Sequence, residues 1–182
     1  DLMAEEAGLD ECLVKNVQDN LDVLPSDMNL AGAEIEFQEI ENKETLLKRY
    51  LDQVRDDYDF ILIDCPPSLN ILTINALTAA DTVLVPIQCE YYALEGLNQV
   101  LKTVELVRKK LNPPNLEMEG VVFTMYDART NLSLQVVESV KSNLNQTIYK
   151  TIIPRNVRLA EAPSHGKSIN LYDTRSTGAE SY

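Results

Sequence analysis

The pattern of apolar and polar positions predicts alternating strands and helices along most of the chain. Leu94, Leu97, Leu101, Val104 and Val107 fall on one stripe at helical spacing, which makes residues 93–111 the clearest predicted helix. The same kind of spacing predicts helices over residues 43–54 and 131–144, and a short helix is predicted at residues 70–80. Continuous apolar runs predict strands buried on both faces at residues 60–63 and 82–87. Shorter strands are predicted at residues 21–24, 120–124 and 151–153.

Strands that alternate with helices of 10 to 18 residues are typical of βαβ crossovers. The expected fold class is therefore α/β, with a mostly parallel sheet and flanking helices. The length of 182 residues predicts one α/β domain over residues 1–182. The first residues read as the tail of a helix closed by Gly8, and residues 176–182 read as a helix just starting. We therefore expect a domain truncated at both ends.

Composition and charge narrow the function classes. Apolar residues make up 45% of the chain and charged residues 25%, as in a soluble globular protein. No apolar run approaches the roughly 18 residues of a membrane helix. The net charge of −13 argues against binding nucleic acid over the whole surface. Residues 121–182 nevertheless carry seven basic and five acidic side chains, which leaves room for an anionic partner on one surface.

Asp64 is the strongest candidate for chemistry in this sequence. It follows the apolar run at residues 60–63, and ligands of parallel sheets bind beyond the carboxyl ends of strands. An apolar strand ending in Asp has the form of a Walker B strand, whose carboxylate helps to hold Mg²⁺ near nucleotide phosphates. The alternative is an ordinary strand-end aspartate that caps a loop. Pro66 and Pro67 predict a stiff loop just beyond the carboxylate.

The phosphate loop that would accompany a Walker B strand is absent from these 182 residues. Gly166, Lys167 and Ser168 resemble the end of such a loop, but Glu161 stands where the motif needs its first glycine. We expect that the phosphate loop of the parent protein precedes this chain.

Four long blocks together resemble the ParA/Soj partitioning ATPases, within the MinD/ParA group of deviant Walker-A ATPases. The first reads Asp-Tyr-Asp-Phe-Ile-Leu-Ile-Asp-Cys-Pro-Pro-Ser over residues 57–68. The others are Pro86–Leu97, Thr124–Thr130 and Ile153–Lys167. The resemblance covers nearly the whole chain. It implies a P-loop NTPase-like, Rossmann-like three-layer fold.

The resemblance also implies a function. Members of this family act as cytoplasmic, nucleoid-associated homodimers that hydrolyse ATP with Mg²⁺. They bind DNA without sequence preference and are stimulated by a ParB-type partner, with no membrane involved. Asp64 would act at the catalytic site and hold Mg²⁺ through water. Without a phosphate loop, the 182 residues alone are expected to be inactive.

By the same resemblance, the loop Pro154, Arg155 and Asn156 would lie against the adenine, with Thr124 and Met125 lining the other side. Pro154 offers a flat apolar face, and the Asn156 amide can read the donors and acceptors of a base edge. From the residues alone, an N-cap for a helix that starts at Val157 is the favoured role of Asn156, and the side chain could serve both roles.

Arg129 and Arg158 are the expected DNA contacts. Both fall in the basic third of the chain, outside the apolar stripes, and the resemblance assigns DNA contacts to these two positions. Cations on phosphates need no base readout. The alternative for each is a solvated surface arginine.

The sequence leaves two alternative functions open. One is a membrane-recruited regulatory ATPase of the MinD type, which a basic amphipathic helix at the C-terminus would indicate. The other is a non-catalytic α/β binding module, in which the absence of the phosphate loop is taken at face value.

Overall fold

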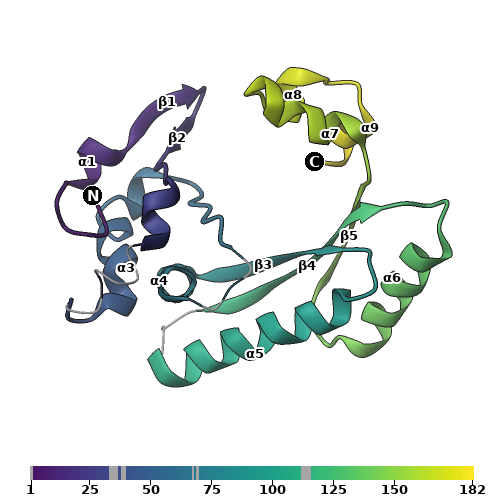
Figure 1. Ribbon diagram of the computed structural model, residues 1–182, viewed down its shortest axis with the longest axis horizontal. Coiled ribbons are helices and arrows are strands. Elements are labelled where there is room, and N and C mark those ends of the chain that lie inside the picture. Colours follow the sequence, from purple (N-terminus) through teal and green to yellow (C-terminus); the bar gives the residue numbers. More distant parts are fainter. Residues whose placement is uncertain (1, 33–36, 38–39, 67, 69, 112–115) are drawn as a thin grey trace. The chain divides into compact units, whose positions relative to one another are not determined.

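The computed structural model describes residues 2–32, 37, 40–66, 68, 70–111 and 116–182. These residues form two compact units. The first unit contains residues 1–81 and 107–116, and the second contains residues 82–106 and 117–182. Each is described by itself below, and Figure 1 labels the elements.

The first unit is made of short elements. It contains α1 (Leu9–Cys12), the antiparallel hairpin of β1 (Val14–Gln18) and β2 (Leu21–Val23), and the 3-10 helix η1 (Met28–Gly32). After these come η3 (Lys43–Thr45), α3 (Leu46–Leu51), η4 (Arg55–Asp57) and α4 (Ile71–Ala79). Phe37 and Leu46 are fully buried and form its apolar centre, against which Ile71 and Leu72 pack.

The second unit is built on a parallel sheet. Its strands β3 (Thr82–Gln88), β4 (Glu117–Tyr126) and β5 (Ile148–Pro154) are hydrogen-bonded in the order β3-β4-β5. The crossovers contain α5 (Ala93–Leu111) and α6 (Asn131–Asn143). Short helices follow β5, namely α7 (Val157–Glu161), η5 (Ala162–His165), α8 (Ile169–Tyr172) and α9 (Thr177–Ser181). This arrangement confirms the predicted α/β class.

The core of the second unit lies between one face of the sheet and the two long helices. Val85 and Ile87 alternate along β3 with exposed neighbours, and Val121 and Phe123 on β4 have no exposed surface. Leu97 of α5 and Val140 of α6 complete this cluster. Figure 1 shows both helices on the same side of the strands. Five of these six buried side chains are aliphatic and the sixth is Phe123, so burial of apolar area chiefly holds this face.

Gly120 permits an irregularity in β4. The pairing with β3 shifts by one residue between Val83 and Leu84, so β4 carries an extra residue at this point. Gly120 has φ +156, and a Cβ there would lie 2.9 Å from the carbonyl oxygen of Thr147 and 2.9 Å from the Tyr149 ring. The close approach of the segment around Thr147 and Tyr149 therefore requires glycine at position 120.

The strand predicted at residues 60–63 is wrong. These residues are in no strand, and Phe60 and Leu62 are 84% and 92% exposed. A strand needs a neighbour to satisfy its ladder of hydrogen bonds. Among the described residues, β1 pairs only with β2, and β3 pairs only with β4, so nothing pairs with this run. Phe60, Ile61 and Leu62 are therefore exposed, and Ile63 is half-buried.

Three smaller expectations also need correction. The strand at residues 82–87 is buried on one face only, because Leu84 is 53% exposed. The first residues form turns, and Gly8 precedes α1 instead of closing a helix. The helix predicted over residues 43–54 is divided into η3 and α3, and ends at Leu51.

Candidate functional site

The carboxyl ends of β4 and β5 meet at one edge of the sheet. Tyr126 of β4 is in register with Pro154 of β5, and the Arg155 backbone N–H donates to the Tyr126 carbonyl at 2.8 Å. On the other side of β4, the Cys89 N–H donates to the Thr124 carbonyl at 3.1 Å. These bonds hold the segments that follow all three strands beside one another, which is where ligands of parallel sheets bind.

Met125 has an unusual backbone conformation at this edge. Its φ is +54, in the left-handed region that side chains rarely adopt, and it lies within β4. The pairing with β5 is irregular between Phe123 and Tyr126, on either side of it. Such strain is held in place by the surrounding hydrogen bonds and is often found at functional sites.

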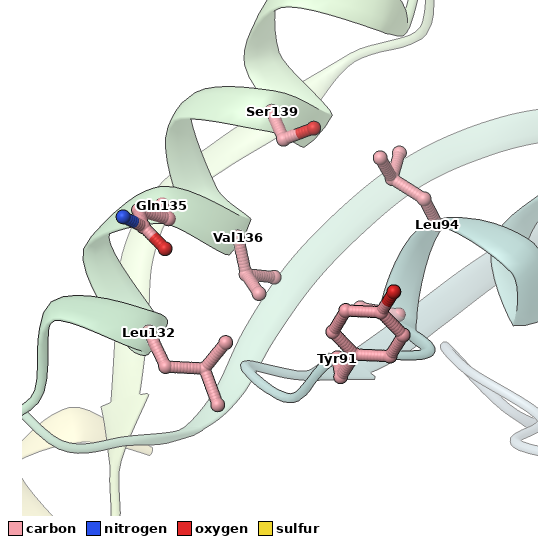
Figure 2. A pocket seen from close by; sticks show the side chains of 7 residues that line it. Tyr91, Leu94, Leu132, Gln135, Val136 and Ser139 are labelled. Carbon is pink, nitrogen blue, oxygen red and sulfur yellow. The ribbon is translucent and has the colours of Figure 1, made fainter.

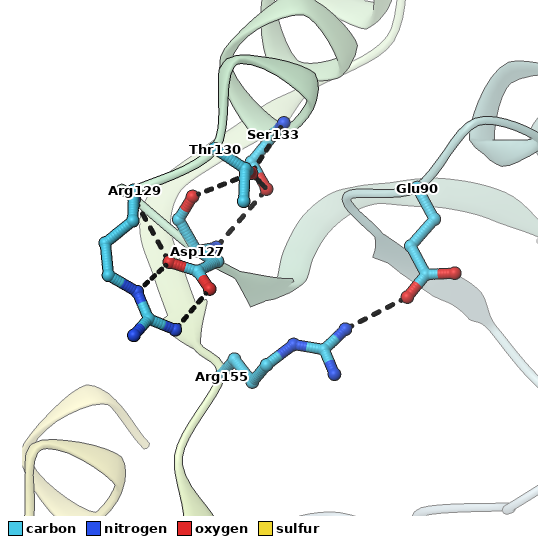
Figure 3. Close-up of polar contacts among 6 residues, drawn as sticks. All are labelled: Glu90, Asp127, Arg129, Thr130, Ser133 and Arg155. Atoms are coloured by element: carbon cyan, nitrogen blue, oxygen red, sulfur yellow. Dashed lines mark hydrogen bonds and ion pairs between the residues drawn. The ribbon is translucent and has the colours of Figure 1, made fainter.

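The loop after β4 is organised by Asp127. Its carboxylate accepts hydrogen bonds from Nε and Nη2 of Arg129 at 2.9 and 2.7 Å, and from the Arg129 backbone N–H at 3.0 Å (Figure 3). These bonds hold the pKa of Asp127 well below its usual range. Thr130 then caps α6 by accepting from the Ser133 N–H. Arg129 is thereby held at the start of α6, with its side chain 86% exposed.

Arg155 links the ends of β5 and β3. Its guanidinium Nη2 donates to Oε1 of Glu90 at 3.0 Å, and Figure 3 shows the side chain extending away from Asp127 toward Glu90. Both side chains are about half exposed. The pair is therefore a solvent-accessible tie across the edge of the sheet, and not a buried charge pair.

Asn156 uses both ends of its amide. Its Oδ1 accepts from the Arg158 backbone N–H at 2.8 Å and so caps α7, as one of the two sequence readings predicts. Its Nδ2 donates to Oγ1 of Thr177 at 2.7 Å, at the start of α9. Pro154, just before, is half-buried.

Arg158 lies on α7 and faces two carboxylates. Its Nη1 donates to Oε2 of Glu161 at 2.8 Å, and its Nε lies 3.4 Å from Oδ2 of Asp173. The hydrogen bond to Glu161 raises the pKa of Arg158 above its usual value, so the guanidinium stays charged. The hydroxyl of Tyr172 donates to the same oxygen of Glu161 at 3.2 Å, and the ring of His165 stacks on the Tyr172 ring.

Asp64 belongs to the first unit, so it is described apart from the sheet edge. It is exposed, and no hydrogen bond or ion pair joins it to another described residue. Desolvation by neighbouring atoms and, to a lesser degree, the Asp64 carboxylate raise the pKa of the adjacent Cys65 thiol. Of the two prolines predicted to stiffen this loop, Pro67 lies outside the described residues.

A closed metal site needs several oxygen, nitrogen or sulfur donors close together. Within the described ranges, no group of three or more His, Cys, Asp or Glu side chains could hold a metal ion. A lone exposed carboxylate fits Mg²⁺, which commonly keeps several waters and takes one or two carboxylates together with substrate phosphates. Asp64 is thus suited to a water-mediated contact and not to a closed metal site.

The structure also holds a shallow apolar pocket that sequence reasoning missed. Tyr91 and Leu94 lie across from Leu132 and Val136, with Gln135 and Ser139 adding polar atoms (Figure 2). Its volume is about 210 Å³. It arises where the start of α5 meets one face of α6, which the helical spacing of each segment alone does not reveal.

Sequence reasoning brought together some site residues and missed the partners of others. Thr124, Met125, Pro154 and Arg155 do share one edge of the sheet. The acidic partners Asp127, Glu161 and Asp173 were not singled out. Two of them had a local signal. An Asp two residues before Arg129 is typical of an Asx turn, and Glu161 lies three residues after Arg158 on a helix. No local signal marks Asp173.

No helix among the described residues is long and apolar enough to cross a membrane.

Comparisons with known proteins identify the class to which this fold and edge belong. A family model described as an AAA domain matches residues 1–118. Cobyrinic acid a,c-diamide synthase from Mycobacterium smegmatis, solved with an ATP analogue and magnesium, matches 100% of the chain at TM-score 0.84 and 33% identity. A plasmid partition protein from Borrelia burgdorferi matches 94% at TM-score 0.70 and 26% identity. The chain spans 66% of each of these solved chains.

Curated relatives define the family more narrowly. The chain is 57% identical over all 182 residues to the sporulation initiation inhibitor protein Soj of Bacillus subtilis, of which it covers 72%. It is 48% identical to the chromosome partitioning protein ParA of Caulobacter vibrioides, of which it covers 68%. The chain therefore belongs to the Soj/ParA family of chromosome-partitioning ATPases, as the resemblance in the sequence implied.

Proposed function

We propose that this chain forms the greater part of a DNA-partitioning ATPase, which hydrolyses ATP with Mg²⁺ as a homodimer in the cytoplasm. The single observation that carries the proposal is the 57% identity to Soj across all 182 residues. In the proposed cycle the dimer binds DNA without sequence preference, associates with the nucleoid and is stimulated by a ParB-type partner. Bound ATP and Mg²⁺ would supply the phosphoanhydride and the charge that stabilises its cleavage.

Asp64 is proposed to orient the hydration shell of Mg²⁺. Its exposure and its freedom from hydrogen bonds to described residues leave both carboxylate oxygens able to accept from metal-bound water. The 182 residues contain no phosphate loop, so we propose that they do not turn over ATP by themselves.

Pro154, Arg155 and Asn156 are proposed to receive the base, opposite Thr124 and Met125. The hydrogen bond from Arg155 N–H to Tyr126 fixes this loop at the sheet edge. Asn156 reaches the base through Nδ2, which must exchange Thr177 for an acceptor of adenine. Its Oδ1 can meanwhile continue to cap α7.

Arg129 and Arg158 are proposed to contact DNA phosphates. Both side chains are more than half exposed and both lie beyond the carboxyl ends of strands in the same unit. Contacts of this kind position a protein on DNA without reading bases, which suits binding without sequence preference.

The test compares Asp64→Asn with Asp59→Asn in the complete protein. Asp59 is an exposed carboxylate on the same segment, so its substitution changes the net charge equally. We expect Asp64→Asn to lower Mg²⁺-dependent ATP hydrolysis at least ten-fold, and Asp59→Asn to leave it within two-fold. Stimulation by DNA and a ParB-type protein is measured alongside.

Equal rates for the two variants would remove Asp64 from the proposed site. Hydrolysis by the purified 182-residue chain that is lost in Asp64→Asn would contradict the proposal that a separate phosphate loop is required. Absence of both hydrolysis and DNA binding in the complete protein would contradict the function itself.

A further inference from the structure

Among the ion pairs described in the second unit, Arg158 is the one basic side chain that contacts two carboxylates. Glu161 accepts from its Nη1 at 2.8 Å, and Asp173 lies 3.4 Å from its Nε. Glu161 comes from the same helix, whereas Asp173 follows α8. One positive charge therefore faces two negative charges, and the local sum is negative.

Each carboxylate is also held by a second contact. The Tyr172 hydroxyl donates to Oε2 of Glu161 at 3.2 Å. The Arg175 backbone N–H donates to Oδ1 of Asp173 at 3.2 Å. Each carboxylate thus keeps one bond to a group other than Arg158 when the guanidinium moves, although the Tyr172 hydroxyl also interacts with Arg158. The two carboxylates therefore remain competitors for the guanidinium.

The Arg158 side chain is nevertheless 51% exposed, so a phosphate can approach it from solvent. A phosphate that binds there must replace at least one carboxylate, and the displaced carboxylate then lies close to the phosphate. Both effects reduce the affinity gained from this arginine, since exposed ion pairs and phosphate contacts are similar charge-assisted bonds.

Arg129 is paired differently. A single carboxylate, Asp127, takes Nε and Nη2 on one edge of the guanidinium, and the side chain is 86% exposed. In the described structure no hydrogen bond is made by Nη1, so part of the fork stays available to a phosphate while the pair is intact. The masking of Arg158 is therefore the stronger of the two.

We infer that Glu161 and Asp173 compete with DNA phosphates for Arg158 and so hold the DNA affinity of this surface below what its arginines could supply. The inference rests on the proposed DNA binding. Glu161 and Asp173 would thereby lower the affinity for DNA without making a favourable contact with it.

The experiment measures binding of the complete protein, with ATP, to a duplex of random sequence at fixed ionic strength. Glu161→Gln and Asp173→Asn remove the competitors. Glu180→Gln is the matched control, because it removes an equal charge from the exposed surface of the nearby α9. We expect Glu161→Gln to tighten binding about two- to five-fold beyond Glu180→Gln, the range that an exposed ion pair supports.

A second arm repeats Glu161→Gln in an Arg158→Ala background. If the carboxylate acts through Arg158, its gain over Glu180→Gln disappears there. Asp173→Asn serves as an independent variant, and thermal unfolding confirms that each protein is folded.

The outcomes separate the two ideas. If the wild-type protein binds no DNA, the proposed function fails, and the inference fails with it. If the wild type binds, but neither acidic substitution tightens binding beyond Glu180→Gln, only the inference is overturned. Weaker binding by Glu161→Gln would also overturn it, because Glu161 would then be a support that orients Arg158.

Discussion

Asn75 offers the sharpest test of what holds the first unit together. The side chain is fully buried in α4, and its three hydrogen bonds all go to backbone groups. Its Oδ1 accepts from the Leu47 N–H at 3.0 Å. Its Nδ2 donates to the carbonyls of Lys43 at 2.7 Å and Ile71 at 2.9 Å. One amide therefore ties α4 to both η3 and α3.

The cost of Asn75→Ala follows from what each partner loses. Leu47 is the second residue of α3, so its N–H has no acceptor within that helix and is left unsatisfied. The Lys43 carbonyl loses its donor as well, whereas Ile71 keeps its place in the hydrogen bonding of α4. The substitution thus removes two non-local hydrogen bonds and leaves the Leu47 N–H without an acceptor. We expect a loss of about 2–4 kcal/mol in the free energy of unfolding.

Urea denaturation followed by circular dichroism measures this loss, and hydrogen exchange at the Leu47 amide localises it. Asn143→Ala is the control, because the Asn143 side chain donates to the Ser139 carbonyl at 2.7 Å on the exposed surface of α6. We expect the control to cost less than about 0.5 kcal/mol. An Asn75→Ala protein as stable as this control, with unchanged protection of Leu47, would refute the reasoning.

Two further predictions concern the second unit. Gly120→Ala should destabilise it by about 1–3 kcal/mol, because the new Cβ would lie 2.9 Å from the Thr147 carbonyl oxygen. Gly96→Ala in α5 should instead stabilise it by about 0.5–1 kcal/mol, because a Cβ there meets nothing within 4 Å. Thermal unfolding of the two variants compares these effects. The lowered pKa of Asp127 means that its bonds to Arg129 stabilise the fold above the unfolded pKa of about 4 and are lost as the pH falls through the folded value. An acid titration of the Arg129 amide resonance should show this change below about pH 4, and Asp127→Asn should abolish it.

The second unit was the more predictable part because each of its elements carries its own signal. The apolar stripe of α5 predicts its observed bounds of residues 93–111, and α6 ends one residue before its predicted end. Both helices bury one face against strands that the same chain supplies. A periodic pattern is reliable when its partner surface is present, since packing then agrees with local preference.

Residues 60–63 show the opposite case. The run Phe60, Ile61, Leu62 and Ile63 has the composition of a buried strand, but composition does not provide a neighbour for its backbone. No described strand pairs with it, and Phe60, Ile61 and Leu62 stay exposed. The sequence pattern thus predicts which side chains a segment would bury as a strand. Whether the strand forms depends on a neighbouring strand, which the fold must supply.

The candidate site divides in the same way. Backbone features of Asn156, such as its cap on α7, follow from residue type and position. The choice of carboxylate by each arginine does not, because long side chains select partners from elements that only the fold brings near. The 14 residues between Arg158 and Asp173 include the end of α7, all of η5 and all of α8, and no spacing rule joins the two side chains.

Net charge is therefore a poor guide to the DNA-facing surface. Residues 121–182 have two more basic than acidic side chains, yet Asp127, Glu161 and Asp173 all hold the two arginines proposed to bind DNA. A guanidinium that leaves a carboxylate for a phosphate exchanges one anion for another. The counterions that the phosphate releases are then offset by those that the freed carboxylate gathers. The salt dependence of DNA binding should accordingly be shallower than the number of arginine contacts implies, and should steepen when Glu161 becomes Gln.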